Sequence, residues 1–348
     1  MRILITGGAG FIGANVADHH LAGGDDVVLF DNLSRPGTTG NIDWLRRRHG
    51  DRLTVVNGDI RDFGAVWSAL WPSADRVYHL AAQVAVTTSV KDPRNDFEVN
   101  ALGTFNVLEA VRQFAPDAVV VYASTNKVYG RMEDLAIVEG PTRYRYRDHP
   151  LGISEKRPLD FHSPYGCSKG CGDQYMRDYA RIYGLKTVVM RQSCIYGTRQ
   201  FGIEDQGWLA HFSIAACHGR PITIYGDGKQ VRDVLWIDDL IAAYDAAAEH
   251  IDVAGGQVYN IGGGASNTVS AWVEFGELLE ELAGEPIDVN FAAWRPGDQP
   301  VYISDIGKAH RDLGWWPHVS LDEGLARLWD WVESEVELGV DVPRVKSA

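Results

Sequence analysis

The sequence predicts an α/β protein in which a doubly wound parallel sheet is joined to a smaller, mixed α/β substrate-binding lobe. Two observations predict this fold class. Short apolar runs alternate with helical patterns through the first half of the chain, and glycine and proline interrupt the pattern after about Arg191. Strand–helix alternation of this kind is typical of parallel sheets that helices cover on both faces. With 348 residues, the chain is long enough for two lobes.

The apolar runs have the length of buried strands, and helical stretches lie between them. We predict strands at residues 3–6, 26–30, 53–56, 76–79, 118–122 and 187–190, and helices at stretches such as 62–71 and 96–114. The crossovers between parallel strands should be right-handed.

The expected boundary between the lobes is not a single cut. Residues 1–191 should form the sheet lobe, together with a returning segment near 232–262 that includes a strand-like run at 258–261. Residues 192–231 and 263–335 should form the second lobe. We expect the tail, 336–348, to be frayed.

Composition favours a soluble enzyme. The formal net charge is −14, whereas nucleic-acid-binding domains are typically basic. The chain has no apolar run of the ~20 residues that a membrane span needs, and no signal-peptide pattern. Its four cysteines form no C-x-x-C pair. We therefore expect a cytoplasmic protein with reduced thiols and with neither nucleic acid nor a membrane as partner.

Residues 7–13 read Gly-Gly-Ala-Gly-Phe-Ile-Gly and stand between a predicted strand and a predicted helix. Gly8-x-Gly10-x-x-Gly13 matches the dinucleotide fingerprint of a Rossmann fold, and Gly7-x-x-Gly10-x-x-Gly13 fits as well. Glycines allow the tight turn and let backbone approach a pyrophosphate. The helix N-terminus offers free N–H groups to the same anion.

Asp31 ends the second predicted strand, 18 positions after Gly13. A carboxylate there holds both ribose hydroxyls and repels a 2′-phosphate, so NAD is favoured over NADP. The nearby Arg35 is the one feature that does not favour NAD. Asp59 and Ile60 follow the third predicted strand, where the adenine should lie.

Tyr165 and Lys169 stand four residues apart in a segment that Pro164 marks as a helix start. This spacing places both side chains on one helix face. An ammonium at ~4 Å stabilises a phenolate by about 4 kcal/mol, which lowers the tyrosine pKa by roughly three units. We therefore expect Tyr165 to be a usable base near neutral pH. Thr125, after the fifth strand, can bridge the tyrosine and a substrate hydroxyl.

These residues, with Asn100, resemble the extended short-chain dehydrogenase/reductase family of nucleotide-sugar enzymes, over nearly the whole chain to about residue 335. The resemblance implies a tightly bound NAD and makes Asn100 the fourth member of an active tetrad with Thr125, Tyr165 and Lys169. The residues expected to contact the cofactor are Gly7, Gly10, Phe11, Ile12, Gly13, Asp31, Asn32, Ser34, Arg35, Asp59, Ile60, Leu80, Ala81, Ala82, Gln83, Asn100, Tyr165, Lys169 and Gln192.

The two positions after Thr125 separate the reactions of this family. Its dehydratases carry Asp-Glu there, as acid and base for removing water. Here they are Asn126 and Lys127, which argues against dehydration. Stretches 124–130, 159–170, 199–208 and 228–235 are similar to 2-epimerases of CDP-linked sugars, of the CDP-paratose/CDP-tyvelose type. The sequence departs from them at Cys194, at 296–297 and over 131–155.

The resemblance implies transient oxidation at C2 of a CDP-linked hexose or deoxyhexose, and return of the hydride to the other face of a 2-keto intermediate. Alternatives are a UDP-sugar 4-epimerase and a non-catalytic NAD-binding regulator on the same fold. The expected substrate-binding residues are Thr125, Asn126, Cys194, Arg199, Arg232, Arg295 and Asp298. The arginines suit a diphosphate, and Asp298 would take the nucleotide ribose.

The sequence also bears on metal and assembly. The histidines, including the pair His19-His20, show no metal-ligand spacing, so no metal is expected. A homodimer or a dimer of dimers is expected, with pairing through the helices near 96–114 and 163–183.

Overall fold

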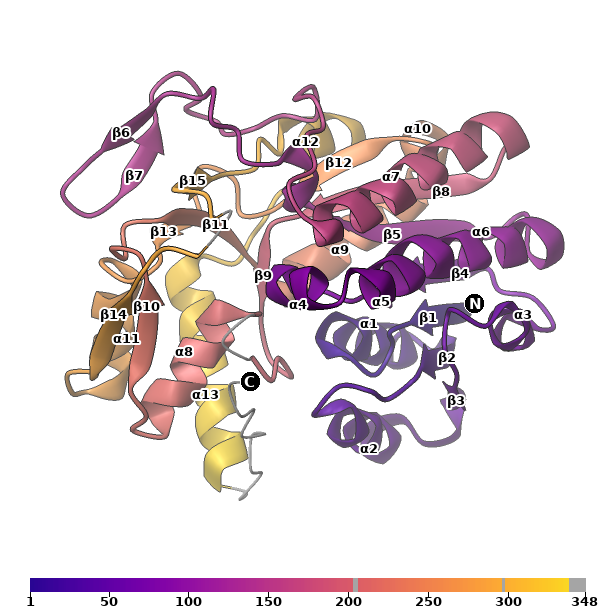
Figure 1. The fold of residues 1–348 in the computed structure, drawn as a ribbon. Helices are drawn as coiled ribbons and strands as arrows, with labels where there is room; N and C mark the ends of the chain where they lie inside the picture. Colours follow the sequence, from indigo (N-terminus) through magenta and orange to yellow (C-terminus); the bar gives the residue numbers. More distant parts are fainter. Residues whose placement is uncertain (203–205, 296–297, 338–348) are drawn as a thin grey trace.

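The computed structural model describes residues 1–202, 206–295 and 298–337, and its centre is a seven-stranded sheet (Figure 1). The strand order is β12-β8-β5-β4-β1-β2-β3, and every neighbouring pair is parallel. The strands are β1 (Arg2–Thr6), β2 (Asp26–Asp31), β3 (Leu53–Asn57), β4 (Arg76–His79), β5 (Val119–Thr125), β8 (Lys186–Gln192) and β12 (Val258–Ile261). The predicted fold class is confirmed.

Alternate side chains of the strands serve two separate cores. Ile3 and Ile5 of β1 pack into one core and Leu4 into the other, and all three are fully buried. The first core also receives α1 (Phe11–Ala22), α2 (Thr38–His49) and α9 (Ile237–Glu249). The second receives α3 (Phe63–Leu70), α6 (Gly103–Phe114) and α7 (Pro164–Tyr183). Because both faces are covered, the strands are continuous apolar runs, which is why they were recognisable in the sequence.

The sheet reverses its direction of growth at β1, which lies between β4 and β2. In such sheets, ligands bind at the carboxyl ends of the strands beside this switch point. The glycine turn follows β1 directly, and Thr125 and Gln192 end β5 and β8. The fold therefore gathers the expected site residues at one edge of the sheet.

The predicted helix at 96–114 is one continuous path with a change of pitch. It comprises α5 (Pro93–Phe97), a π-helical turn (Glu98–Leu102) and α6, and a short helix, α4 (Val86–Lys91), precedes it. Single π turns inside helices are frequent at functional sites. The Asn100 side chain comes from this turn.

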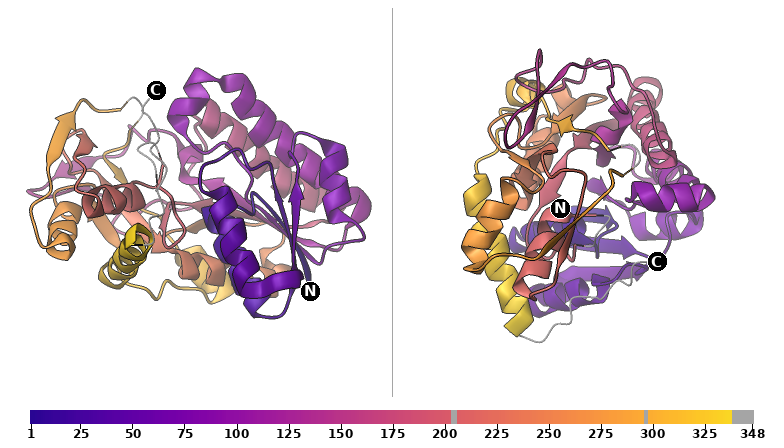
Figure 2. Two further views of the ribbon diagram at one scale, coloured as in Figure 1. Left: turned by 90° about the horizontal axis from the view of Figure 1, so that it is seen from below. Right: turned by 60° about the vertical axis from the view of Figure 1, so that its left-hand side comes forward.

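The smaller lobe is built from short strands and helices (Figure 2). In its largest sheet, β11 (Val231–Trp236) pairs with β13 (Thr268–Ser270), β15 (Val301–Tyr302) and β9 (Cys194–Tyr196). The two other pairs are β10 (Ile222–Tyr225) with β14 (Val289–Ala292), and β6 (Ile137–Glu139) with β7 (Tyr144–Tyr146). Its helices are α8 (Trp208–Cys217), α11 (Phe275–Ala283) and α13 (Leu321–Glu337), whereas α12 (Gly307–Leu313) packs against β12 and against the helices beside it.

The chain returns to the large sheet late in the sequence. β11, at the start of the expected returning segment, belongs to the small lobe, whereas α9, the short α10 (Ile251–Ala254) and β12 lie with the large sheet. Within the described residues, no helix is both long enough and apolar enough to cross a membrane. Residues 338–348 of the expected tail, and the departure at 296–297, lie outside the described residues.

Candidate active site

The glycine turn packs too closely for side chains. Gly7 has a φ of +69°, and a Cβ on it would lie 2.7 Å from the backbone nitrogen of Ala81. A Cβ on Gly13 would lie 2.4 Å from the Gly7 carbonyl oxygen. Helix α1 begins after Gly10, with no side chain capping its first turn, and Phe11 and Ile12 are its first residues. These features fit a dinucleotide, because the pyrophosphate needs close backbone and free N–H groups.

Asp31 ends β2 beside this turn. Its carboxylate accepts hydrogen bonds from the backbone N–H groups of Ala9 at 3.1 Å and Leu33 at 2.8 Å. Burial raises the pKa of the Asp31 carboxyl, although these two bonds and the charge of Arg35 oppose the rise. The structure thus places a buried carboxylate where the sequence predicts the ribose to bind.

The loops after β2 and β3 meet. Asn32 donates to Asp59 at 3.0 Å, and Ser34 donates its N–H to Asn32. Asp59 is also paired with Arg61 at 2.8 Å, and these bonds hold the pKa of Asp59 well below its usual range. Ile60 differs from the expectation in part: its side chain is buried against Gly103, and its carbonyl oxygen accepts a hydrogen bond from Asn106 at 2.9 Å.

Arg35 reaches the other lobe. Its guanidinium hydrogen-bonds to Gln206, in the segment before α8, and its charge lowers the pKa of Tyr165. Arg35 therefore lies close enough to Asp31 and Tyr165 for its charge to act on both.

Thr125 and Tyr165 meet at the carboxyl edge of the sheet. Thr125 ends β5 in register with Gln192 of β8. Helix α7 begins at Ser163, whose hydroxyl caps it by accepting from the Gly166 N–H at 3.0 Å, with Pro164 in the first turn. This start places the Tyr165 side chain in hydrogen-bond contact with Thr125.

The acidity of the tyrosine differs from the prediction. Burial raises the pKa of Tyr165 to about 12, although the bond to Thr125 and the charge of Arg35 oppose this. Burial also lowers the pKa of Lys169 to about 7, opposed by Asp173 and Asp96. The prediction that Lys169 makes the phenol acidic is wrong for the protein as it stands, because both groups are almost fully enclosed.

Asn100 joins two parts of the site. Its Oδ1 accepts from the Gln83 N–H at 2.9 Å, and its Nδ2 lies 3.0 Å from the Gln83 carbonyl and 3.1 Å from the Ser168 hydroxyl. Ser168 in turn donates to Asp96 at 2.6 Å. Asn100 therefore fixes the loop after β4, residues 80–83, against the helix that carries Tyr165 and Lys169. Sequence reasoning missed Asp96 and Ser168, which carried no motif of their own.

The expected substrate residues come mainly from the small lobe. Arg232 of β11 donates to Asp298 at 2.7 Å. Arg295 lies over the ring of Tyr225, with its guanidinium carbon 3.9 Å from the ring centroid. Cys194 begins β9. Burial raises the pKa of its thiol, and the nearby charge of Arg232 opposes this rise.

Asn126 and Lys127 come from β5's end, in the 3-10 turn Asn126–Tyr129. Asn126 is buried and accepts a hydrogen bond from Thr125 at 3.4 Å. The charges of Arg232 and Asp298 act on the Lys127 ammonium, so this side chain joins the two lobes at the site. From the sequence, Lys127 argued only against dehydration.

Arg199, which was expected to bind the substrate, has a different role in the structure. Its guanidinium is buried, donates to Glu335 of α13 and to Asn41 at 3.0 Å, and packs beside the ring of Trp331. A charge enclosed in this way ties α2 to α13 and is not directed at Arg232 or Asp298. The sequence could not show this, because Glu335 lies 136 positions further along.

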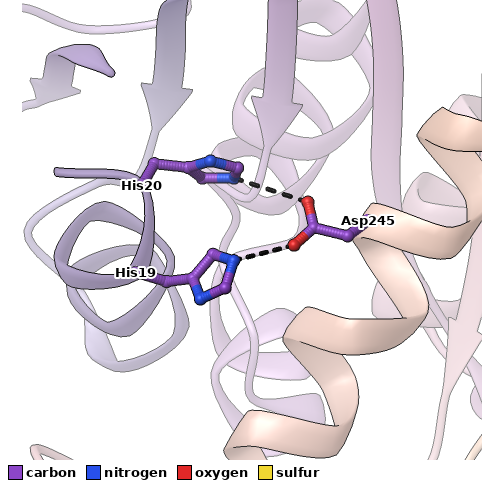
Figure 3. A group of neighbouring side chains, drawn as sticks. All are labelled: His19, His20 and Asp245. Atoms are coloured by element: carbon purple, nitrogen blue, oxygen red, sulfur yellow. Dashed lines mark hydrogen bonds and ion pairs between the residues drawn. The ribbon is translucent and has the colours of Figure 1, made fainter. Parts of the chain in front are cut away.

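A second polar cluster joins the end of α1 to α9 (Figure 3). His19 and His20, at the end of α1, approach Asp245 of α9 at 2.8 Å and 3.7 Å. Candidate ligand atoms of all three lie within 4.8 Å of one another, which the residue spacing had not indicated. Arg76 also donates to Asp245, at 2.8 Å. Because this guanidinium already neutralises the carboxylate, the cluster reads as an ionic tie between α1 and α9.

Comparison with known proteins fits this geometry. A family model described as GDP-mannose 4,6 dehydratase matches residues 4–328. The chain belongs to this family.

Individual relatives narrow the comparison. A CDP-paratose 2-epimerase of Salmonella typhi is 46% identical over 342 residues, covering 96% of this chain and 100% of that one. The UDP-glucose 4-epimerase of Thermotoga maritima, solved with UDP-glucose, is 31% identical with a TM-score of 0.82, covering 97% of this chain and 100% of that one. The UDP-glucuronic acid 4-epimerase of Bacillus cereus, solved with UDP-glucuronic acid and NAD, is also 31% identical, with a TM-score of 0.82 and coverage of 96% and 99%.

These relatives confirm the predicted family resemblance. They also confirm the predicted enzyme class, an NAD-dependent nucleotide-sugar epimerase.

Proposed function

We propose that this enzyme inverts C2 of a CDP-linked hexose or deoxyhexose. The observation that carries the proposal is the 46% identity to a CDP-paratose 2-epimerase, over 96% of this chain and 100% of that one. Asn126 and Lys127 support it, because neither side chain can perform the carboxylate chemistry of a dehydratase.

The residues for holding NAD are the glycine turn, the Asp31 carboxylate, the loops after β2, β3 and β4, and Gln192. NAD, when bound, supplies a reversible hydride acceptor. Epimerisation by this route returns the cofactor to its starting state, so NAD can stay bound through many turnovers.

Within the site, we assign Tyr165 as the base that takes the proton of the C2 hydroxyl, with Thr125 bridging the two groups. Because the pKa of Tyr165 is about 12 in this structure, it must fall when the site is loaded. The charge of Arg35 already acts in this direction, and the positive charge of NAD⁺ would add to it. Asn100 holds the two halves of this arrangement together.

Inversion through a planar 2-keto sugar sets a binding requirement. The nucleotide must be held firmly while the sugar turns over. We assign Arg232 and Arg295 to the diphosphate and Asp298 to the nucleotide ribose, because a planar guanidinium suits a phosphate. Binding would then replace the present contact between Arg232 and Asp298 with contacts to the substrate.

A UDP-sugar 4-epimerase is the second candidate, because two solved relatives of 31% identity carry that activity in their names. Isotope labelling separates the two. We expect a primary kinetic isotope effect with a CDP-sugar deuterated at C2 and none with deuterium at C4. The opposite result would favour 4-epimerisation. Solvent deuterium entering C2 would contradict direct return of the hydride.

We further propose a homodimer, or a dimer of dimers, in the cytoplasm. Helices α6 and α7 lie side by side and, with α5 and the π turn, expose a set of large apolar side chains: Phe97, Leu102, Phe105, Tyr175, Ile182 and Tyr183. An exposed apolar surface of this kind favours association. All four cysteines are free thiols, which suits a reducing compartment. Light scattering of Phe105→Asp should report a smaller particle than the wild type.

A further inference from the structure

Lys127 is held in place by its backbone. Its N–H donates to the Thr125 hydroxyl at 3.2 Å, and its carbonyl accepts from the Gly130 N–H at 3.2 Å. These bonds fix the backbone of Lys127 in the 3-10 turn and tie it to Thr125.

The Lys127 ammonium has weak bonding for a half-buried cation. Its hydrogen-bond partner among the described residues is the Gln299 Oε1, at 3.5 Å. No described carboxylate lies within ion-pair distance of Lys127. The nearby Asp298 carboxylate already accepts from Arg232 at 2.7 Å and from the Gln299 N–H at 3.0 Å.

The residues around Lys127 orient the Gln299 amide toward its ammonium but do not neutralise the ammonium charge. The Gln299 Nε2 donates to the Gly130 carbonyl, which turns its Oε1 toward Lys127. Burial and the charge of Arg232 lower the pKa of Lys127. Leaving an ammonium with so few acceptors costs free energy, which an oxygen acceptor on a ligand would recover.

We propose that Lys127 is a substrate-binding residue whose ammonium donates to an oxygen of the nucleotide sugar, either a sugar hydroxyl or a phosphate oxygen, and so helps to select the substrate. The inference rests on the proposed function, since it requires a nucleotide sugar between Thr125 and Arg232. It adds a residue that neither the glycine turn nor the tetrad contains.

The test compares Lys127→Met with the wild type in the NAD-loaded enzyme. Loss of a hydrogen bond from a charged donor should raise KM for the CDP-sugar by about 10-fold or more, while kcat changes less. Lys127→Arg should recover part of the affinity. Lys156→Met, an exposed lysine outside the site, should leave KM unchanged.

The pH profile distinguishes binding from a structural role. In the wild type, KM should rise at alkaline pH as the ammonium loses its proton, and this rise should be absent in Lys127→Met. Inhibition by CDP then locates the acceptor: an equal loss of CDP affinity indicates a phosphate oxygen, and an unchanged CDP affinity indicates a sugar hydroxyl. Retained NAD and an unchanged melting temperature would show that the variants are folded.

A KM for Lys127→Met within about twofold of the wild type, with the same pH profile, would overturn the inference. Its failure is separate from failure of the proposed function. The wild type alone decides whether CDP-sugars are epimerised at C2. The ratio of variant to wild type decides the role of Lys127, with whichever nucleotide sugar the wild type converts.

Discussion

The ammonium of Lys169 lies over the ring of Tyr122, 4.3 Å from the ring centroid. Tyr122 belongs to β5, three residues before Thr125, so the strand that carries one member of the site also holds another in place. A cation over an aromatic face is stabilised by about 0.5–2 kcal/mol, which offsets part of the cost of burying it. Burial nevertheless lowers the pKa of Lys169 to about 7, so the charge of this ammonium can change near neutral pH.

Tyr165→Phe should lower kcat by roughly 10²–10⁴-fold, because it removes the proposed general base. NAD should remain bound, since the glycine turn and Asp31 are untouched. Steady-state kinetics and mass spectrometry of the intact holoenzyme measure both. Tyr175→Phe, at an exposed position on the same helix, is the matched control and should be neutral. Turnover of Tyr165→Phe close to that of the control would remove Tyr165 from the mechanism.

Ionisation of Tyr165 should depend on the cofactor. In protein stripped of NAD, the pKa of about 12 predicts that this phenol stays protonated through pH 10. Binding of NAD⁺ adds positive charge and should bring ionisation to lower pH. The difference in phenolate absorbance between the wild type and Tyr165→Phe, titrated with and without NAD⁺, measures this. An identical titration in both states would mean that the cofactor does not activate the tyrosine.

Asp31→Ser should weaken NAD binding by about 10-fold or more, the loss expected for hydrogen bonds to a charged group. The substitution should also reduce the preference for NAD over NADP, because it removes the carboxylate that repels a 2′-phosphate and leaves Arg35 nearby. Calorimetry with each cofactor tests this. Asp26→Ser, at the exposed start of the same strand, serves as the comparison. A variant that binds NAD as the wild type does would place the ribose elsewhere.

Asp245→Asn should destabilise the fold by about 1–3 kcal/mol, because it leaves Arg76 and His19 without their carboxylate. The loss should depend on pH. The hydrogen bond to Asp245 raises the pKa of His19, so its contribution is complete below pH 6.5 and disappears as pH rises through the raised value.

Burial raises the pKa of Asp245, but its bonds and nearby charges outweigh this and hold it below 3.8. Its contribution is therefore present above that value and is lost as pH falls through the lowered one. Urea unfolding should show the largest difference between wild type and variant from about pH 4 to 6.5. Asp252→Asn, on the exposed side of α10, is the control. If the difference in unfolding free energy does not change with pH, His19 does not contribute to stability through Asp245.

The sequence was most informative where its physical signals are local. Each predicted strand of the large sheet lies within the observed one or differs by a residue at its start, because strands buried on both faces must be apolar throughout. The i, i+4 pair on α7 and the glycine turn follow from backbone geometry alone.

Contacts between distant segments could not be predicted in this way. Nothing near Lys169 in the sequence indicates that Tyr122 lies beneath it, and nothing near Arg199 points to Glu335. The acidity of Tyr165 was misjudged for the same reason: the spacing fixes its distance from Lys169 along the helix, whereas burial depends on every element packed around the pair.

Strand β12 has a consequence for how the protein is made. It is the edge strand of the large sheet, yet it follows β9, α8, β10 and β11 of the small lobe in the chain and is synthesised after them. A nascent chain that ends before Val258 leaves β8 as an open edge, a template for pairing with another molecule. The cofactor lobe therefore cannot be completed co-translationally as an independent unit, and a fragment ending at residue 191 should aggregate rather than fold.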